Sequence, residues 1–199
     1  MKIVLASGSP SRKKIFASLK ILFEVIESEI DEEKVKGQVK SPRQMVKRLA
    51  FKKAMVVVKK LKKQKRKNFL VIGADSTAAM RVKNKWRFFG KPKNKKEARD
   101  ILWFLRGKRH QFFTGLAAIS SLGRKWENVA ISNVYFGNFS KNTLENVLKR
   151  GIWRERAGGY DIDKDKSRLI EKFEGSYSNI LGMPMEKLGS ILKEMGIKI

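Results

Sequence analysis

Apolar positions along the chain change period several times, and each change marks the end of a predicted element. The first apolar run, KIVLA over 2–6, is short and continuous, which is typical of a buried strand. A small turn, SGS over 7–9, follows, and Pro10 opens a segment whose apolar residues at 15, 16 and 19 fall on one helix face. Ser9 suits the N-cap and Pro10 the first helical position, so the pattern predicts a strand, a tight turn and a helix.

The first turn of this helix is a candidate anion site. A helix start exposes backbone N–H groups and the positive end of the helix dipole, and both attract phosphate. Arg12 lies in this turn, where a cation slightly opposes the dipole but suits bidentate hydrogen bonding to the same anion. An ordinary β–α unit with a surface arginine explains the same residues equally well, so the segment alone leaves both interpretations open.

The longest helical pattern runs from about Pro42 to about Lys63. Its apolar residues recur at the third or fourth position, at 46, 49, 50, 54, 57, 58 and 61. Lys53 falls inside this stripe, where a charge is costly unless its stem carries the ammonium to water or an anion compensates it. Both explanations stay open. If the anion is a bound phosphate, we expect Lys53→Met to keep or raise stability while weakening phosphate binding.

The run FLVIGAD over 69–75 predicts a fully buried strand that ends in a carboxylate, Asp75. Ligands of open α/β sheets bind at the carboxyl ends of strands, which makes Asp75 a candidate site residue, although a turn-capping aspartate gives the same pattern. Further on, the sequence predicts a hairpin turning at 83–85, helices over about 94–106, 140–150 and from 184 onward, and strands over about 111–119 and 129–136. Residues 152–168 resemble a loop. The alternation indicates an α/β fold with some antiparallel pairing.

Composition narrows the class of protein. A chain of 199 residues predicts one domain over 1–199. No apolar run approaches the length of a membrane span, and a strand beginning at Lys2 leaves no room for a signal peptide, so we expect a cytoplasmic protein without membrane contact. Zero cysteines exclude disulfides and thiolate chemistry, and the single histidine, His110, excludes a histidine-rich metal site within one chain. His110 follows a predicted helix, and we expect it to stabilise that helix end.

The charge balance is strongly basic, with 46 Lys+Arg against 19 Asp+Glu and a net charge of +27. Such a balance favours anionic partners: nucleotides, nucleic acid or an anionic surface. Many lysines fall on predicted outer helix faces, where they serve solubility, so nucleic acid is not the favoured partner. The one acidic stretch, over 23–33, is explained as a solvated strand end and loop.

Eight short motifs follow one another along the chain: LASGSPSR at 5–12, DE at 31–32, LAFKKA at 49–54, GADS at 73–76, GKP at 90–92, LRGKRHQFFTG at 105–115, AGGY at 157–160 and EGSYSNILGMP at 174–184. Together they resemble the Maf family of septum-formation-associated nucleoside triphosphate pyrophosphatases. The resemblance covers nearly the whole chain.

Three positions depart from the family pattern. Ser11 stands where the family has the first of two arginines, Ser76 replaces the threonine of G-A-D-T, and Asp163 replaces a glutamine in the loop after Tyr160. Loss of an arginine would weaken phosphate binding, and Asp163 would either add a metal ligand or repel the phosphates. Because of these departures, the sequence does not decide which nucleotide base is preferred or how fast the substrate is turned over.

The resemblance implies a mixed, twisted central sheet flanked by helices, with two lobes around a central cleft, as in inosine-triphosphate pyrophosphatases. It implies hydrolysis of a non-standard or pyrimidine nucleoside triphosphate to the monophosphate and pyrophosphate, which would clean the nucleotide pool. A homodimer is a further expectation from the family.

That reaction needs cations for the triphosphate, a divalent ion and a water in line with the α-phosphorus. The resemblance gives the candidates: Arg12, Lys53 and Lys91 as cations; Glu32 and Asp75 as ligands of Mg²⁺ or Mn²⁺, with Asp75 also orienting or deprotonating the water; Ser7 and Ser9 holding the phosphate chain; and Ser76 and Asp163 close by.

Three other functions are alternatives to a Maf-like pyrophosphatase. A basic nucleic-acid-binding module predicts cations and aromatic side chains on one face, but here carboxylates fall in the same predicted cleft as the cations. A catalytically weak regulator associated with cell division, binding nucleotides or a partner, is favoured by Ser11 and Asp163. An inosine-triphosphate pyrophosphatase would open with Thr-x-Asn-x-x-Lys, which this chain lacks.

Overall fold

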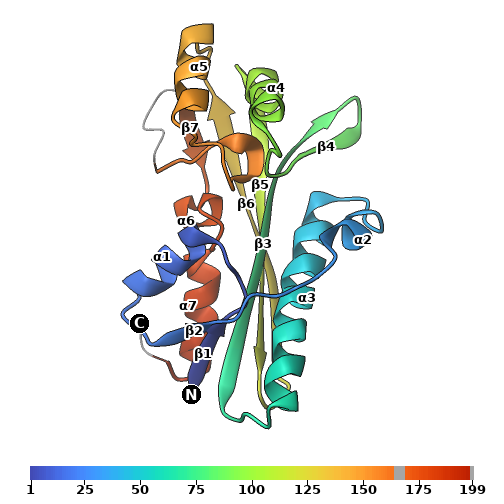
Figure 1. Ribbon diagram of the computed structural model, residues 1–199, viewed down its shortest axis with the longest axis vertical. Coiled ribbons are helices and arrows are strands. Elements are labelled where there is room, and N and C mark those ends of the chain that lie inside the picture. Colours follow the sequence, from blue (N-terminus) through green and yellow to red (C-terminus); the bar gives the residue numbers. More distant parts are fainter. Residues whose placement is uncertain (164–168, 198–199) are drawn as a thin grey trace.

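One mixed sheet forms the centre of the structure, a computed structural model that describes residues 1–163 and 169–197 (Figure 1). Within these residues the sheet has seven strands: β1 Lys2–Leu5, β2 Phe23–Val25, β3 Phe69–Val82, β4 Lys85–Phe89, β5 Arg109–Ser120, β6 Lys125–Phe136 and β7 Ile170–Glu174. The order is β2-β1-β3-β5-β6-β7, and β4 also pairs with β3. β1 runs parallel to β2 and β3, and the other pairs are antiparallel.

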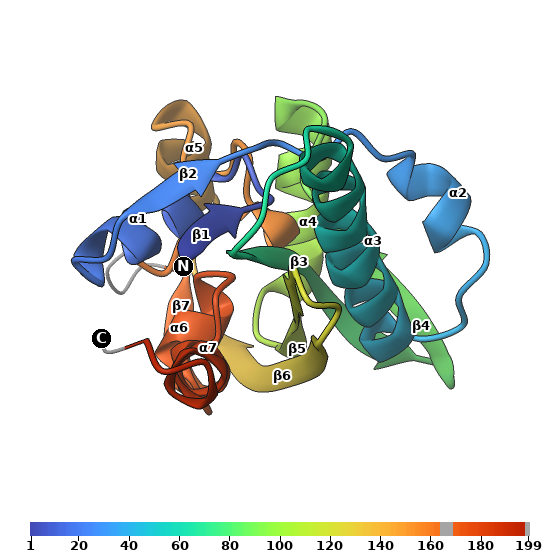
Figure 2. The same cartoon turned by 90° about the horizontal axis from the view of Figure 1, so that it is seen from below.

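Helices cover both faces of this sheet (Figure 2). They are α1 Pro10–Ser18, α2 Glu32–Lys36, α3 Pro42–Lys63, α4 Lys95–Leu105, α5 Lys141–Lys149, α6 Tyr177–Ile180 and α7 Met185–Glu194, with one 3₁₀ turn, η1 Ala157–Gly159. α3 packs on one face through its apolar stripe, and α1 and α7 pack on the opposite face. The mixed α/β fold with a helix-flanked central sheet is therefore confirmed.

The buried apolar residues divide the molecule into two lobes. In the upper part of Figure 1, α4, α5 and η1 share a core with β4 and the adjacent ends of β3, β5 and β6, including Phe89, Leu102 and Phe136. In the lower part, separate cores fill the two faces of the sheet, one under α3 and one under α1 and α7. The long strands β3, β5 and β6 run through both lobes, so the lobes share one sheet.

Most predicted elements are confirmed. α3, α4 and α5 begin after serine or asparagine N-caps whose side chains accept a backbone hydrogen bond, as at Asn94 and Ser140. The predicted hairpin forms between β3 and β4, and its two turn residues, Lys83 and Asn84, both have positive φ. The sequence does not predict α2, α6 or β7. The two helices are too short to show a helical period, and β7 shows no alternation of buried and exposed residues. The predicted loop over 152–168 contains η1, and its residues 164–168 lie outside the described part.

The predicted end of β3 at Asp75 is wrong, because the strand continues to Val82. On one edge β5 pairs with β3 from Leu70 to Ala79. On the other edge β1 pairs only as far as Ile72 and β4 begins only at Ala78, so residues 73–77 have no strand partner there in the described chain. Asp75 thus lies in a gap between two strands along an edge, and this gap opens the sheet to a pocket.

Two glycines let α3 lie directly against the sheet beside this gap. A Cβ on Gly73 would stand 2.3 Å from the carbonyl oxygen of Ala50, and a Cβ on Gly115 would stand 2.2 Å from that of Val46. Gly115 pairs with Asp75 in the sheet. Both contacts involve helix backbone, which cannot move aside like a side chain, so the glycines set the distance between α3 and the Asp75 region.

We therefore expect Gly73→Ala to destabilise the fold by about 3 kcal/mol, at the upper end of the usual cost of overpacking a core. The measurement is the free energy of unfolding in urea. Gly37→Ala is the matched control, because Gly37 has φ −63° and a Cβ there would meet its nearest atom at 3.6 Å. Equal stability of the two variants would show that α3 does not need this close approach.

No helix in the described part of the chain combines the length and the apolar character that a membrane crossing requires.

Candidate functional site

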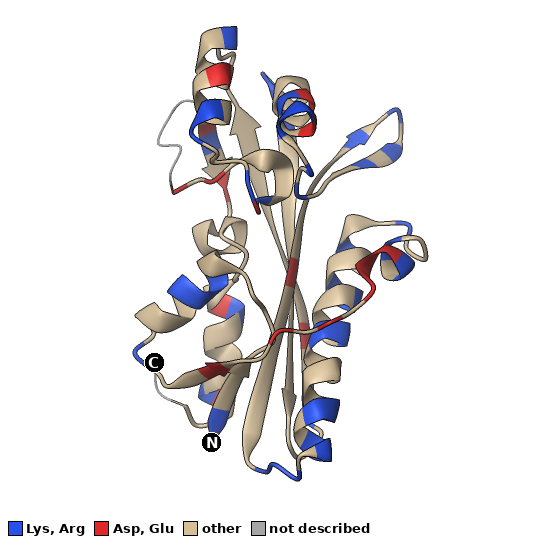
Figure 3. Ribbon diagram, in the orientation of Figure 1, with Lys and Arg blue, Asp and Glu red and all other residues tan. Residues whose placement is uncertain are grey.

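A pocket of about 770 Å³ lies between the two lobes, at the gap in the edge of β3. Its walls come from the loop after β1, the start of α1, α2, α3, β3, the segment before α4, the η1 region and the turn before α7. Carboxylates gather here, and Figure 3 shows acidic residues (red) on the middle of β3 and along the segment that leads into α2: of the 19 acidic residues of the chain, the lining includes Glu27, Glu32, Glu33, Asp75, Glu97, Glu155 and Asp161. In a chain with net charge +27, such a gathering of carboxylates indicates a site that binds cations as well as anions.

Lys53 joins two carboxylates at the centre of the pocket. Its Nζ lies 2.6 Å from Oδ1 of Asp75 and 2.7 Å from Oε1 of Glu32. The side chain of Lys53 is only 12 % exposed, so its ammonium is compensated by carboxylates of the chain and does not reach bulk water. The structure thus decides between the two explanations of the stripe lysine, since its anions are Asp75 and Glu32.

The two carboxylates have opposite pKa shifts. Burial raises the pKa of Asp75, and the positive charges of Lys53 and Arg12 offset this only partly. Burial acts in the same direction on Glu32, but Lys53 and Lys36 outweigh it and hold the pKa of Glu32 below its usual value. A pair of acids with pKa values moved apart is the usual arrangement where one carboxylate accepts a proton and the other stays ionised.

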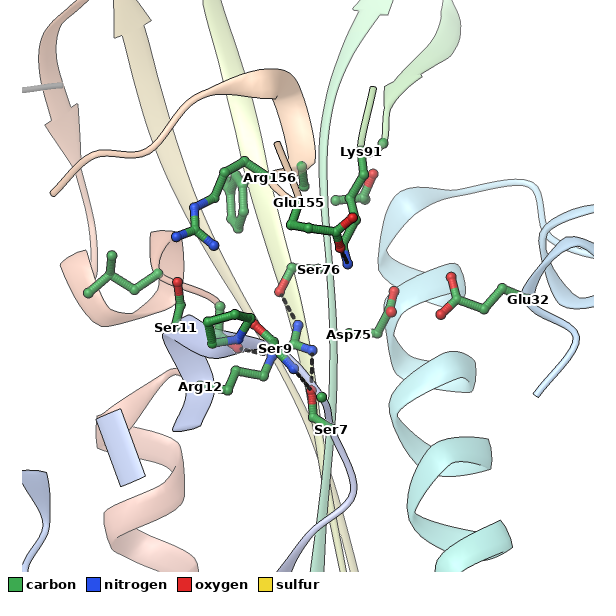
Figure 4. A pocket seen from close by; sticks show the side chains of 18 of the residues that line it. Ser7, Ser9, Ser11, Arg12, Glu32, Asp75, Ser76, Lys91, Glu155 and Arg156 are labelled. Carbon is green, nitrogen blue, oxygen red and sulfur yellow. Dashed lines mark hydrogen bonds and ion pairs between the residues drawn. The ribbon is translucent and has the colours of Figure 1, made fainter. Parts of the chain in front are cut away.

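Arg12 is buried at the floor of the pocket, so it is not a surface arginine. Its Nε donates to the carbonyl oxygen of Gly182 at 2.9 Å, and its two terminal nitrogens donate to the hydroxyls of Ser7 at 3.1 Å and Ser76 at 2.9 Å (Figure 4). Burial lowers the pKa of Arg12, while Asp75 and Glu32 act against this shift. Arg12 therefore ties the loop after β1 to β3 and to the turn before α7.

The serines predicted to hold the phosphate chain all line the pocket. Ser9 occupies the N-cap of α1, but its side chain makes no capping bond, and its own N–H donates to the hydroxyl of Ser7 at 3.3 Å. Ser76 lies on the opposite face of β3 from Asp75 and is also 3.0 Å from the hydroxyl of Thr114. Because the pocket opens at the strand edge, it reaches side chains on both faces of β3.

Two predicted residues are less central. Lys91 lines the pocket, but its ammonium lies 2.7 Å from Glu155 and its side chain is more than half exposed, so it stands at the rim. Asp163 is not among the lining residues; its carboxylate accepts a hydrogen bond from the hydroxyl of Tyr177. The structure brings together Ser7, Ser9, Arg12, Glu32, Lys53, Asp75 and Ser76, with Lys91 at the rim and Asp163 outside.

Sequence reasoning missed an ion pair in the wall opposite α1. Arg156 donates through Nε to Oδ2 of Asp161 at 2.8 Å, and both residues line the pocket. The only signal in the sequence is the mixed charge of the segment 152–168. Mixed charge is common in exposed loops, so it does not indicate a site. Neither residue lies on a periodic pattern, so nothing in the sequence pointed either side chain inward.

The prediction for His110 is wrong in its location. His110 lies in β5 and is buried, and its Nε2 is 2.9 Å from the hydroxyl of Tyr160, with rings of Phe136 and Tyr160 packed against it. Its Nδ1 has no hydrogen-bond partner among the described residues. Burial lowers the pKa of His110 to about 3, so it is neutral at physiological pH and belongs to the core of the upper lobe.

This pKa shift makes stability depend on pH. His110 titrates near 6.5 when unfolded and near 3 when folded, so the unfolded chain binds the extra proton first and stability falls as the pH drops below 6.5. Between pH 7 and pH 5 we expect a loss of about 2 kcal/mol from this group alone. His110→Phe should flatten the dependence, measured by urea unfolding at both pH values. Parallel curves for the two proteins would contradict the assignment.

The donor set fits a divalent cation of the Mg²⁺ class. Glu32 and Asp75 already hold one positive group, the Lys53 ammonium, between their oxygens. No group of three or more His, Cys, Asp or Glu side chains with metal-binding geometry occurs among residues 1–163 and 169–197. Mg²⁺ is commonly held by one or two carboxylates together with substrate phosphates, so two carboxylates that line this pocket are a sufficient protein contribution.

The chain is similar to a known protein family and to curated proteins over nearly its whole length. A family model described as "Maf-like protein" matches residues 2–195. A curated protein from Clostridioides difficile named dTTP/UTP pyrophosphatase is 37 % identical over 195 residues, which cover 98 % of this chain and 95 % of that protein. A protein of the same name from Acetivibrio thermocellus is 33 % identical over 202 residues, covering 100 % and 98 %.

Solved structures show the same fold at low sequence identity. A HAM1 protein from Coxiella burnetii superposes with a TM-score of 0.56 at 14 % identity, covering 98 % of this chain and 99 % of the other. The Ham1 protein of Staphylococcus aureus gives a TM-score of 0.54 at 13 % identity, covering 98 % and 100 %. At this identity the likeness concerns the fold alone.

Proposed function

This chain belongs to the Maf family and is a nucleoside triphosphate pyrophosphatase, and on that premise we propose that it hydrolyses the pyrimidine triphosphates dTTP and UTP. Two curated relatives that match over nearly their whole length carry these substrates in their names. The observation that supports the chemistry most is the placement of Lys53 between Glu32 and Asp75 inside the pocket. The alternative of a catalytically weak regulator is not favoured, since the curated relatives are named as enzymes.

The reaction adds water across the bond between the α- and β-phosphates. The water oxygen bonds to the α-phosphorus, the bond to the β-phosphate oxygen breaks, and the products are the nucleoside monophosphate and pyrophosphate. Asp75 would accept a proton from the water, because burial raises the pKa of its carboxyl and makes it a stronger base than an exposed aspartate. Glu32, whose pKa stays low, would remain ionised throughout.

A divalent cation held by Glu32 and Asp75 would neutralise negative charge that develops on the phosphates. The residues of the chain supply the rest. Arg12, Ser7 and Ser9, with the free backbone N–H groups at the start of α1, form the anion-binding floor. Lys53 would move between its carboxylate partners and a phosphate oxygen, and Lys91 would meet the triphosphate from the rim. A cytoplasmic location and a homodimer stay predictions.

The test is a panel of standard and modified triphosphates incubated with the purified protein and Mg²⁺ or Mn²⁺. Pyrophosphate and orthophosphate are assayed separately, because cleavage at the α-phosphorus releases only the former. We expect pyrophosphate from dTTP and UTP at rates well above those from purine triphosphates, and none in excess chelator. Release of orthophosphate, or a preference for purine nucleotides, would contradict the proposal.

A further inference from the structure

One cation of the pocket has donors that no described residue of the chain occupies. Arg156 immediately precedes η1, on the wall opposite α1, and its guanidinium points toward Ser11 at the start of that helix (Figure 4). The side chain is 19 % exposed, so it lies within the pocket wall. Because Ser11 is uncharged, Arg12 is the only cation of α1 among the described residues that line the pocket.

Four of the other cations that line the pocket already donate to groups of the protein. Lys53, Lys91 and Lys36 each contact a carboxylate at 2.6 to 2.7 Å. Arg12 donates to two hydroxyls and a carbonyl oxygen. Each of these groups therefore already directs some of its N–H donors at acceptors of the protein. Lys93 is exposed, and its flexible side chain loses conformational freedom on being held.

Arg156 is fixed along one edge only. Its Nε donates to Oδ2 of Asp161 at 2.8 Å, and Oδ1 of Asp161 accepts from the N–H of Asp163 at 3.0 Å, so the anchor is itself held in place. Within the described chain, hydrogen bonds of this guanidinium reach Asp161 alone. The terminal nitrogens Nη1 and Nη2 therefore remain available, and a guanidinium presents such a pair in the geometry of two phosphate oxygens.

From this arrangement we infer that Arg156 binds the phosphate chain of the nucleotide from the wall opposite α1, and that Asp161 is the positioning residue that orients its guanidinium. The inference rests on the proposed function, since it assigns a residue to that same pocket. The phosphates would lie between the anion-binding floor at the start of α1 and the Nη pair of Arg156. Among the described residues no group accepts from either terminal nitrogen of Arg156, whereas both terminal nitrogens of Arg12 and the Nζ of Lys53 already donate to groups of the protein.

The test is calorimetric titration with inorganic tripolyphosphate, which carries the phosphate chain without base or sugar, in the presence of a chelator. Arg156→Gln should weaken binding about 10- to 100-fold, the loss expected for a charge-assisted pair of hydrogen bonds. Arg154→Gln is the matched control: Arg154 is exposed in the same segment, lies over the ring of Trp153 and does not line the pocket. Both variants lose one positive charge, so the long-range effect of charge is the same in each.

A second set of variants separates positioning from folding. Asp161 is buried and loses its partner in Arg156→Gln, so the double variant Arg156→Gln/Asp161→Asn removes that unpaired charge. We expect the double variant to recover thermal stability but not tripolyphosphate affinity. Asp161→Asn alone should raise KM for the nucleotide with a smaller change in kcat, and it should add no further loss when combined with Arg156→Gln.

Three outcomes would overturn the inference: binding by Arg156→Gln within twofold of Arg154→Gln, no measurable binding of tripolyphosphate to the unaltered protein, or recovery of affinity in the double variant. The first of these, combined with normal pyrophosphate release by the unaltered protein, would leave the proposed function standing. Absence of pyrophosphate release from every nucleotide, with tripolyphosphate binding lost in Arg156→Gln, would contradict the function but keep the anion contact.

Discussion

Asp75→Asn is expected to reduce pyrophosphate release by about 10²- to 10⁴-fold, the usual loss when a general acid or base is removed. Asparagine has the shape of aspartate but cannot accept a proton from water, and it is a poor ligand for a divalent cation. Lys53 keeps its contact with Glu32 in this variant, so its ammonium still has a carboxylate partner. The fold should therefore survive, which circular dichroism and urea unfolding would show beside the rate measurement.

The control is Asp100→Asn, which removes the same charge from an exposed position of α4 outside the pocket and should leave the rate unchanged. The pH dependence gives a second readout. In the unaltered protein the rate should fall as the pH drops through the raised pKa of Asp75, because the protonated carboxyl accepts nothing from water. The residual rate of Asp75→Asn should lack that step, and a variant with a near-normal rate would remove Asp75 from the mechanism.

Lys53→Met is expected to lower both stability and activity. The ammonium compensates Asp75, a buried carboxylate, and removal of one partner from a buried pair is more costly than replacement of both. Arg12 still acts on Asp75 and Glu32 is half-exposed, so we expect about 2–3 kcal/mol, somewhat below the full cost of breaking a buried pair. Urea unfolding at neutral pH measures this loss.

The loss should depend on pH in a definite direction. Without Lys53 the pKa of Asp75 rises further in the folded protein, above the value it has when unfolded. A group of this kind favours folding at low pH and disfavours it as the pH rises through the folded pKa, so the deficit of Lys53→Met should grow with pH and shrink in acid. The double variant Lys53→Met/Asp75→Asn should recover most of the stability at neutral pH.

Activity of Lys53→Met should fall sharply, because a phosphate loses a cation whose side chain is largely buried in the pocket wall. Lys52→Met is the control, since Lys52 lies on the exposed face of α3 and outside the pocket. Unchanged stability and kinetics in Lys53→Met would mean that Lys53 has no part in the site.

This expectation reverses the one drawn from the sequence. A lysine without a partner on an apolar stripe lowers the stability of the fold, because its charge is partly buried. For such a lysine, Lys53→Met keeps or raises the free energy of unfolding. The stripe places Lys53 correctly on the sheet-facing side of α3, but a stripe says nothing of what lies opposite it. Asp75 comes from β3 and Glu32 from α2, and only their arrival at the same point turns the lysine into a partner of buried charge.

Several site residues were predictable because local patterns placed them. The small turn before Pro10 put Ser7, Ser9 and Arg12 at a helix start, and the motifs shared with the Maf family added Glu32, Lys53, Asp75, Ser76 and Lys91. Asp163 came from the same source and is not among the lining residues. Arg156 and Asp161 were missed because an ion pair in an irregular segment leaves no period in the sequence.

The sequence by itself determined the elements and the family. Periods of 3.6 and 2 residues, N-cap residues and turn residues act over a few positions, so α1, α3, α4, α5, α7 and most of the strands follow from them. The tertiary structure alone decided where β1 stops and β4 begins along one edge of β3, and therefore that Asp75 opens onto a pocket from the middle of a strand. It also decided the partners of Lys53, Arg12 and Arg156, because a charged side chain is satisfied by whichever groups packing brings within about 3 Å, and those groups lie far away in the sequence.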